Sequence, residues 1–291
     1  QDSPSWVFKG EWNGTINQNM FAEFRAGQFG YNFGLNSNTG DARYESFTTN
    51  QILGGGRDWE SRRRRNQFTG SLSYFKDNFL GGSHNLKTGG EYLAESGQTL
   101  WNQAYANNVI HFVNGDLTGP LAGVTPASVR LQNNADAKNA LATTSFFVTD
   151  TWTIQRLTVN AGARFDRYRV WLPEQTRPAG RFSTAETFAE RSSIVSFNHL
   201  VPRLGASYDV MGDGTTVVKA NIGRLYFNTG VNLADALNPN TANQYSDYVW
   251  NDLNNDRVFQ NGEQGALETR FGGVANAFID PDLEHAYTDE A

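Results

Sequence analysis

The feature of this sequence that most constrains its fold is an alternation of apolar and polar residues, which recurs in segments of about nine to eleven residues. The clearest segment places Leu157, Val159, Ala161, Ala163 and Phe165 on one face and Thr158, Asn160, Gly162, Arg164 and Asp166 on the other. Successive side chains of a β-strand point to opposite faces, so this pattern predicts a strand with one apolar and one polar face. Such segments are longer than the strands typical of soluble proteins.

Eight such segments follow one another along the chain. We predict strands at residues 5–13, 17–34, 57–76, 84–97, 141–153, 156–170, 194–211 and 215–228. They pair into hairpins, the first turning at Asn13-Gly14 and the last at Asp213-Gly214, a pair that suits a tight turn with positive φ.

The connections between these segments alternate in length. Links within the hairpins are short, whereas the links between hairpins, at about 35–56, 98–140, 171–193 and 229–291, are far longer. Short turns therefore lie at one end of the sheet and long loops at the other, as in outer-membrane barrels with short periplasmic turns and long extracellular loops. A soluble β-sandwich would scatter long and short links over both ends.

The charges of these segments favour the same interpretation. Arg or Lys on the lipid face of a barrel costs about 2–4 kcal/mol at the bilayer midplane. The charges on the polar register are Lys9, Glu11, Glu23, Arg25, Lys87, Glu91, Arg164, Asp166, Arg203, Asp209 and Lys219. Two charges, Asp150 and Arg224, fall on the apolar register, both at strand ends. A soluble sheet with one buried face gives the same alternation, so the pattern indicates one-sided burial rather than lipid itself.

Composition and motifs exclude several other classes of protein. Without cysteine there is no disulfide framework and no thiolate site, and a net charge of −6 argues against a nucleic-acid partner. No apolar run approaches the length of a transmembrane helix, which leaves membrane strands open. The histidines are widely separated and no catalytic motif is present, so we predict that the chain is not an enzyme.

Residues 252–263 have the spacing of a calcium-binding loop. Oxygen ligands stand at positions 1, 3 and 5 of the loop and a glutamate at position 12, namely Asp252, Asn254, Asp256 and Glu263. Position 6 is Arg257, where the sharp turn favours Gly, and this substitution weakens the match. Two interpretations stand: a calcium site, with calcium as the one cofactor predicted, or a polar loop that uses Asn and Asp for its turns.

The four arginines from Arg62 to Arg65 form the one run of like charge. In a strand these side chains alternate between the faces, so two of them would point toward lipid unless the run lies beyond the bilayer. We predict that it lies at the loop end of its strand. It is either a solvated strand end or a patch that binds lipopolysaccharide phosphates or another anion.

Two hairpins resemble those of TonB-dependent outer-membrane receptors. Residues 145–152, Ser-Phe-Phe-Val-Thr-Asp-Thr-Trp, form an aromatic strand with Asp-x-Trp, and residues 157–166 end in Gly-x-Arg-aromatic-Asp. Residues 201–208, 214–220 and 223–226 are similar to the next hairpin of that family.

Two further segments resemble the Oar-like branch, whose members carry an N-terminal carboxypeptidase-regulatory-like domain. These are His-Asn-Leu-Lys-Thr-Gly-Gly-Glu at 84–91 and the closing residues 280–290. The matches to the family run from about residue 66 to the end of the sequence.

The resemblance implies a 22-stranded barrel with a plug, which takes up scarce nutrients with energy relayed by TonB. Eight strands are fewer than half of that number, and no plug, TonB box or regulatory domain is visible. We therefore expect an all-β, antiparallel up-and-down barrel segment, with residues 1–291 forming a partial receptor barrel and 229–291 a long extracellular loop. The expected location is the outer membrane of a Gram-negative-type bacterium.

The expected partners are outer-membrane lipid and lipopolysaccharide, the TonB complex through the missing N-terminal part, and an unidentified small-molecule, glycan or peptide ligand. The alternatives are a complete, non-energised eight-stranded barrel and a soluble β-sandwich with carbohydrate-binding loops. A secreted β-rich hydrolase is a weaker third alternative.

Overall fold

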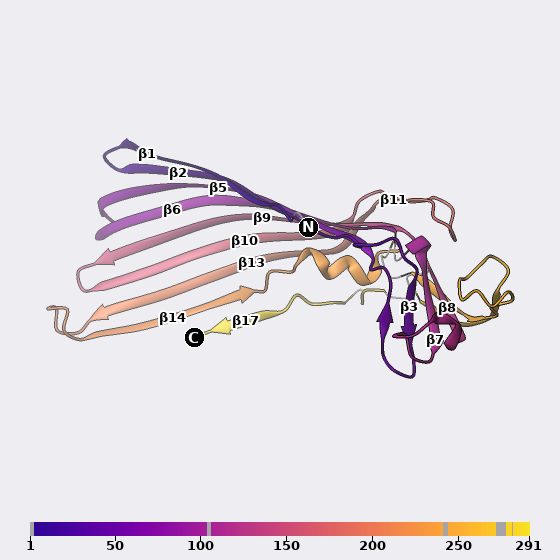
Figure 1. Ribbon diagram of the computed structural model, residues 1–291. Helices are drawn as coiled ribbons and strands as arrows, with labels where there is room; N and C mark the ends of the chain where they lie inside the picture. The colour runs from indigo at the N-terminus through magenta and orange to yellow at the C-terminus, as the bar shows by residue number, and fades with distance from the viewer. Residues whose placement is uncertain (1–2, 104–105, 241–243, 272–277, 281) are drawn as a thin grey trace.

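A computed structural model describes residues 3–103, 106–240, 244–271, 278–280 and 282–291 of this all-β chain. Nine strands form one long antiparallel sheet, in which each strand pairs with its neighbours in the order β1-β2-β5-β6-β9-β10-β13-β14-β17 (Figure 1). Their bounds are β1 Ser5–Asn17, β2 Met20–Leu35, β5 Asp58–Phe79, β6 Gly82–Gln103, β9 Ala135–Ile154, β10 Leu157–Leu172, β13 Arg191–Asp209, β14 Val217–Tyr226 and β17 Tyr287–Glu290. Within the described residues β1 and β17 are the free edges of this sheet.

The arrangement of short and long connections agrees with the prediction. The short links are residues 18–19, 80–81, 155–156 and 210–216, and they lie together at one end of the sheet (Figure 1). The last of these turns places Gly212 and Gly214 at positive φ, and both carboxylate oxygens of Asp209 accept hydrogen bonds from their backbone N–H groups. The long connections gather at the opposite end.

Two expected boundaries are wrong. Asn13 and Gly14 are not a turn, because β1 continues through them and Gly14 pairs with Ala22; the turn follows Asn17, whose side chain accepts a hydrogen bond from the Asn19 N–H group. The expected loop over 229–291 ends in a ninth strand, β17, which pairs with β14. A strand as short as β17 has too few residues for its alternation to be recognised.

The long loops contribute a second sheet at the loop end of the molecule (Figure 1). Its order is β16-β15-β8-β7-β3-β4, and all of its pairings are antiparallel except β3 with β7. The strands are β3 Arg43–Ser46, β4 Ile52–Leu53, β7 Val109–Asn114, β8 Thr125–Gln132, β15 Tyr245–Trp250 and β16 Gln264–Phe271. A small hairpin, β11 Gln175–Arg177 with β12 Glu186–Phe188, and the 3₁₀ turns η1 Ala106–Asn108 and η2 Leu121–Gly123 complete this region. Tyr44, Val113, Val129, Trp250 and Phe259 belong to its buried core.

One loop segment, the 3₁₀ helix η3 Val231–Leu237, packs against the polar face of the long sheet. Val231 and Ala234 join a buried cluster with Leu141 of β9 and Val170 of β10. The adjoining loop is fixed by side-chain amides, because Asn238 donates to the Asn139 side chain and Asn240 donates to the Asp136 carbonyl. Asn139 also donates to the Asp235 carboxylate. The loop therefore covers part of the sheet instead of extending away from it.

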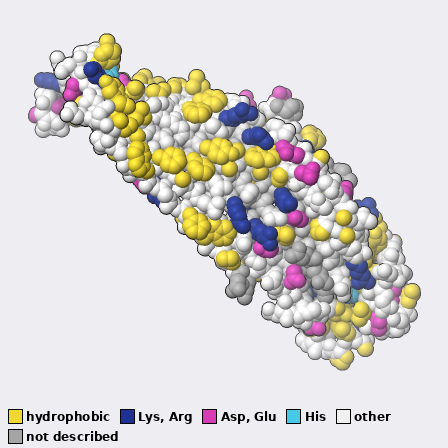
Figure 2. Space-filling view, turned by 90° about the horizontal axis from the view of Figure 1, so that it is seen from above, with side chains coloured by type: hydrophobic (Ala, Val, Ile, Leu, Met, Phe, Trp, Pro, Cys, Tyr) yellow, Lys and Arg dark blue, Asp and Glu magenta, His cyan; other side chains and the backbone are white. Residues whose placement is uncertain are grey.

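The apolar face of the long sheet is uncovered. Phe8, Phe146, Leu200 and Ile222, one each from β1, β9, β13 and β14, are 64%, 60%, 73% and 60% exposed. Figure 2 shows hydrophobic side chains gathered in rows over the long sheet, with Lys, Arg, Asp and Glu side chains gathered closer to the loop end. Within the described residues no second sheet shields this face, unlike the inner faces of a β-sandwich. No helix in the described part of the chain is long and apolar enough to cross a membrane.

Candidate functional site

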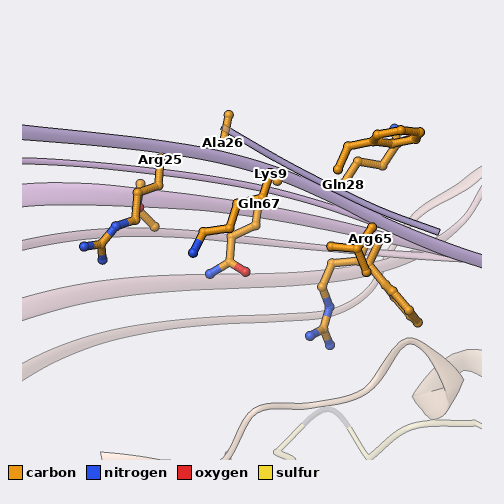
Figure 3. A pocket seen from close by; sticks show the side chains of 11 residues that line it. Lys9, Arg25, Ala26, Gln28, Arg65 and Gln67 are labelled. Carbon is orange, nitrogen blue, oxygen red and sulfur yellow. The ribbon is translucent and has the colours of Figure 1, made fainter. Parts of the chain in front are cut away.

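The polar face of the long sheet is the first candidate site, and it is here called the inner wall. Strand register puts Lys9 opposite Gly27, which is opposite Gln67, so these residues share one face across β1, β2 and β5. Figure 3 shows Lys9, Arg25 and Arg65 pointing to one side of these strands, whereas Gln28 points to the other side. The predicted division of charges between the faces is therefore confirmed for this part of the sheet.

A chain of ion pairs runs across the inner wall from β1 to β6. Glu11 lies 3.7 Å from Lys9 Nζ and 3.2 Å from Arg25 Nε. Arg25 Nη2 also lies 3.3 Å from the Glu23 carboxylate, and Lys87 Nζ forms an ion pair with that carboxylate at 2.9 Å. Charges of opposite sign alternate along this chain, so the strands are tied together by their polar side chains and the wall has little net charge there.

A second network crosses from β5 to β10. Gln67 Nε2 donates to Glu91 at 2.7 Å, and Arg164 bridges Glu91 at 3.5 Å and Asp166 at 2.8 Å. Asp166 is 5% exposed and also accepts a hydrogen bond from the Ser145 hydroxyl at 2.5 Å. A buried carboxylate is stable only when it is paired and hydrogen-bonded, and Asp166 meets both conditions.

A hollow of about 370 Å³ lies between these networks, on β1, β2 and β5 (Figure 3). Its polar lining includes Lys9, Arg25, Arg65 and Gln67. Arg65 Nε donates to Glu95 at 2.6 Å across the β5–β6 ladder, so all three cations of the hollow are paired with carboxylates. The hollow is an open depression of the inner wall that presents amide and guanidinium groups.

The two charges that the sequence pattern places on the apolar register, Asp150 and Arg224, are both paired. Asp150 lies opposite Leu86, beside His84, whose Nδ1 is 2.6 Å from the carboxylate, and the Trp152 ring stacks on the His84 imidazole. Arg224 pairs with Asp289 of β17. Sequence reasoning placed both charges at strand ends but missed their partners, which lie 66 and 65 residues away along the chain.

The predicted calcium ligands lie in one loop between β15 and β16. Asn255 and Arg257, at positions 4 and 6 of the loop, have positive φ, and the Arg257 N–H group donates to Asp252 Oδ2 at 3.1 Å. Arg257 also places its guanidinium Nη1 2.5 Å from that carboxylate, so a cation of the chain itself faces the first ligand position. Asp252 Oδ1 is buried without a hydrogen-bond partner.

The other predicted ligands are engaged within the loop. Asp256 accepts the Val258 N–H group at 2.8 Å, and Glu263 accepts N–H groups of Leu253 and Gln260. Among the described residues no three His, Asp or Glu side chains are arranged to hold a metal ion. Calcium binding by this loop stays a prediction.

The arginine run lies in β5 toward the loop end, and its side chains alternate between the faces. Arg63 and Arg65 share the inner register, and Arg63 Nη2 lies 3.5 Å from Asn232 of η3. Arg62 and Arg64 share the outer register. There Arg62 Nε donates a hydrogen bond to the Glu60 carboxylate at 2.7 Å, and the Arg64 guanidinium lies over the Trp6 ring.

A groove of about 340 Å³ in the loop region was not foreseen from the sequence. It lies between the β11–β12 hairpin and the second sheet, and its lining includes Arg177, Arg270, Tyr245, Tyr248 and Phe271. These residues come from segments distant in the sequence, and no local motif joins them. The lining also includes Phe182 and Glu186, and the Glu186 carboxylate forms an ion pair with Arg177. Aromatic rings beside guanidinium groups give this groove the chemistry to hold a planar ligand.

Two of the widely separated histidines also meet in space. His199 Nε2 lies 2.9 Å from His285 Nδ1, and His285 Nε2 lies 2.6 Å from the Phe227 carbonyl oxygen. The Tyr226 ring stacks on the His199 imidazole. This cluster joins β13 to the segment that precedes β17.

Comparison with known proteins gives one family match. A family model described as "Outer membrane beta barrel domain" matches residues 2–291. No curated protein matches the sequence.

Three solved structures resemble parts of this fold. The outer membrane transporter YddB from Escherichia coli has a TM-score of 0.56 and 12% identity over 85% of this chain and 31% of its own. The siderophore receptor PiuA from Acinetobacter baumannii has a TM-score of 0.46 and 12% identity, over 87% of this chain and 38% of PiuA. The ferric-catecholate import receptor Fiu from Escherichia coli K12 has a TM-score of 0.44 and 16% identity, over 87% of this chain and 39% of Fiu.

At 12% identity the likeness to YddB concerns the fold alone, and the chain spans about a third of the length of that transporter. The family match covers almost the whole chain, and the uncovered apolar face with turns at one end and loops at the other agrees with it. The chain therefore belongs to the outer membrane beta-barrel domain family, and the outer membrane is its location.

Proposed function

We propose that the chain is part of the barrel of an outer-membrane receptor that takes up a ligand through its interior with energy relayed by TonB. In this proposal residues 1–291 are a partial barrel domain, and the plug and TonB-binding segment belong to a missing N-terminal part of a longer protein. The role is that of a receptor rather than an enzyme, and the hairpin motifs favour the Oar-like branch.

The observation that carries the proposal is the chemistry of the inner wall. Its ion-pair chains cross six strands and leave amide and guanidinium groups facing inward. A wall of paired charges suits a water-filled or plugged interior, as in the polar interiors of outer-membrane barrels. A sheet that buried this face against its own core would instead need apolar side chains there.

The groove in the loop region is the proposed first contact for the ligand. It lies at the end of the molecule that faces the exterior in this orientation, and its lining combines Arg177 and Arg270 with aromatic rings. The proposed ligand is a small molecule, a glycan or a peptide. Lipid and lipopolysaccharide are the proposed partners of the outer face.

A medium-depletion experiment tests the proposal and does not require the ligand to be identified beforehand. Cells that express the full-length gene, cells that lack it and expressing cells without TonB are grown in the same defined medium, and the medium is compared by mass spectrometry. We expect at least one component to be depleted only when both the receptor and TonB are present. Depletion that persists without TonB would favour the non-energised barrel, and unchanged medium in all strains would contradict an uptake role.

A further inference from the structure

We propose that the groove in the loop region binds an acidic glycan, an oligosaccharide that contains a uronic acid. The inference rests on the proposed function, which makes this groove the first contact for the ligand. It deepens that proposal by selecting one chemical class of ligand and by assigning roles to the residues that line the groove.

The floor of the groove is one face of the second sheet. Ser246 of β15 pairs with Leu131 of β8 and with Arg270 of β16, and residues that lie opposite one another on paired strands share a face. Tyr248 lies on the same face, because it follows Ser246 by two residues in β15. Leu131 and Tyr248 pack against the buried core of the loop region, so the floor rests on a fixed support.

The other side of the groove comes from the β11–β12 hairpin. Arg177 of β11 pairs with Glu186 of β12 along the backbone, and their side chains form an ion pair. Arg177 Nη1 also donates to the Gln244 amide oxygen at 2.6 Å, which ties the hairpin to the residue before β15. Phe182, in the connection between β11 and β12, packs against the same buried core as Leu131. Side-chain contacts therefore hold the two sides of the groove in place.

The polar groups of the groove include both donors and acceptors of hydrogen bonds. Asn133 and Gln244 contribute amides, and Glu186 contributes a carboxylate. Arg177 Nε is buried and has no hydrogen-bond partner among the described residues, so this donor is available to an oxygen atom that enters beside it. A sugar hydroxyl both donates and accepts hydrogen bonds. Donors and acceptors side by side therefore match a ligand with many hydroxyl groups.

Aromatic rings supply the apolar part of the site. Tyr248 of the floor and Phe182 of the hairpin connection both line the groove. A pyranose ring presents C–H groups on its flat faces, and an aromatic ring offers a rigid apolar surface on which such a face can pack. The lining therefore provides for both the hydroxyl groups and the apolar faces of a sugar.

The charges of the groove favour a sugar that carries a carboxylate. Glu186 is bound by Arg177, so these two charges compensate each other. The exposed Arg270 is the second cation of the described lining, and it has no such partner there. One guanidinium can hold one carboxylate through two parallel hydrogen bonds. A metal chelate with several negative charges would meet only this one uncompensated cation.

The size of the groove fits a short part of a glycan. Its volume of about 340 Å³ lies near the lower end of the range of about 300–1,000 Å³ for small-molecule sites. A peptide would instead be expected to add a strand to a sheet edge, and within the described residues β16 is such an edge. Binding of that kind uses backbone hydrogen bonds and does not require the side chains of the groove.

The test measures glycan binding by the full-length receptor purified in detergent. The probes are an array of uronic acid oligosaccharides and the carboxyl-reduced form of each, which keeps the hydroxyl groups and loses the charge. Arg270→Gln removes the cation, and Ser246→Trp fills the floor of the groove. Arg167→Gln, which replaces an exposed arginine of β10 outside the groove, is the matched control. Circular dichroism and heat-dependent gel mobility confirm that each variant is folded.

We expect wild type and the Arg167→Gln control to bind at least one acidic oligosaccharide, and to bind its carboxyl-reduced form at least about tenfold more weakly, because charge-assisted hydrogen bonds are strong. Arg270→Gln should lose this preference, and Ser246→Trp should bind neither form. The proposal is overturned if the two forms bind equally, if either groove variant binds like wild type, or if no oligosaccharide binds.

Medium depletion reports uptake separately from glycan binding. A receptor that depletes a component of the medium in a TonB-dependent way but binds no acidic glycan contradicts only this inference. A receptor that binds an acidic glycan but depletes nothing contradicts only the proposed uptake.

Discussion

Arg224 of β14 and Asp289 of β17 occupy directly opposite positions and form a two-point ion pair, with Nε–Oδ1 at 2.7 Å and Nη2–Oδ2 at 2.9 Å. The guanidinium also lies over the Tyr287 ring, 3.8 Å from its centroid. Paired N–H···O bonds between a guanidinium and a carboxylate fix geometry as well as charge. This pair therefore sets the register of a strand that has only four residues.

Replacing Asp289 with Asn should loosen β17, since it removes the charge and one acceptor of the pair. We expect faster amide hydrogen exchange at residues 287–290, with exchange in β9 and β10 unchanged. Lys9→Gln, which alters a well-exposed ion pair on the opposite edge of the sheet, serves as the control. Identical exchange of β17 in the Asp289→Asn variant and wild type would show that backbone pairing alone holds this strand.

Replacing Ala234 with Glu should detach η3 from the inner wall. Ala234 is fully buried against the apolar cluster that includes Leu141 and Val170, so the substitution buries an unpaired charge at a cost of about 3 kcal/mol or more. We expect new protease cleavage within residues 229–240 and greater uptake of a small hydrophilic dye by cells. Leu233→Glu, on the exposed side of η3, should change neither measurement. If both variants behave like wild type, η3 is not held by this cluster.

Removing the guanidinium of Arg164 should destabilise the barrel, because Asp166 would remain buried with only Ser145 as a side-chain partner. Arg164 is partly exposed, so we expect a loss of about 1–3 kcal/mol in the free energy of unfolding. Urea unfolding of the protein in lipid vesicles measures this loss. The double variant Arg164→Ala with Asp166→Asn should recover part of it. A double variant no more stable than Arg164→Ala would contradict the role assigned to the buried carboxylate.

Calcium binding by residues 252–263 is expected only at high concentration, on the order of 10⁻⁴–10⁻³ M, as for extracellular modules. Isothermal titration of the whole chain with calcium should give heat that Glu263→Gln removes. Arg257→Gly should strengthen binding, since it removes the internal cation from Asp252 and restores the residue suited to positive φ. Absence of heat at millimolar calcium in both wild type and Arg257→Gly would leave the polar loop as the explanation.

Acidification should loosen the second sheet through His111. Burial lowers the pKa of His111 below its ordinary value of 6.5, and the neutral Nε2 accepts the Phe259 N–H group at 2.9 Å. Above pH 6.5 the imidazole is neutral in both the packed and the open sheet, so the packing is at full strength. As the pH falls below that value, only the open form takes up a proton, and the sheet loses stability.

Amide exchange in β7 and β8 between pH 7.5 and 5.5, corrected for the intrinsic pH dependence, measures this effect. His111→Gln should flatten the pH dependence, whereas His84→Gln, in the long sheet, should leave it intact. A pH profile that is the same in His111→Gln and wild type would assign the effect to another group.

The sequence by itself determined eight of the nine strands of the long sheet, their two faces and the ends at which turns and loops lie. Residues 157–166 show why this was possible. Successive side chains of a strand point to opposite faces, so the face of each residue follows from whether its position is odd or even, which the local sequence alone gives. The predicted segregation of charge onto the inner wall held for the same reason. The exceptional positions Asp150 and Arg224 were also visible, because they break the local pattern.

Only the tertiary structure decided what the loops do and which charges are paired. Val231 and Ala234 are apolar residues in a loop with no strand period, and their burial depends on Leu141 and Val170, which come from distant strands. The partners of Asp150 and Arg224, the second sheet and the groove at Arg177 and Arg270 depend likewise on contacts between distant segments. Periodicity reports the environment on either side of one strand, whereas these features require knowing which segments meet, and the folded chain alone supplies that.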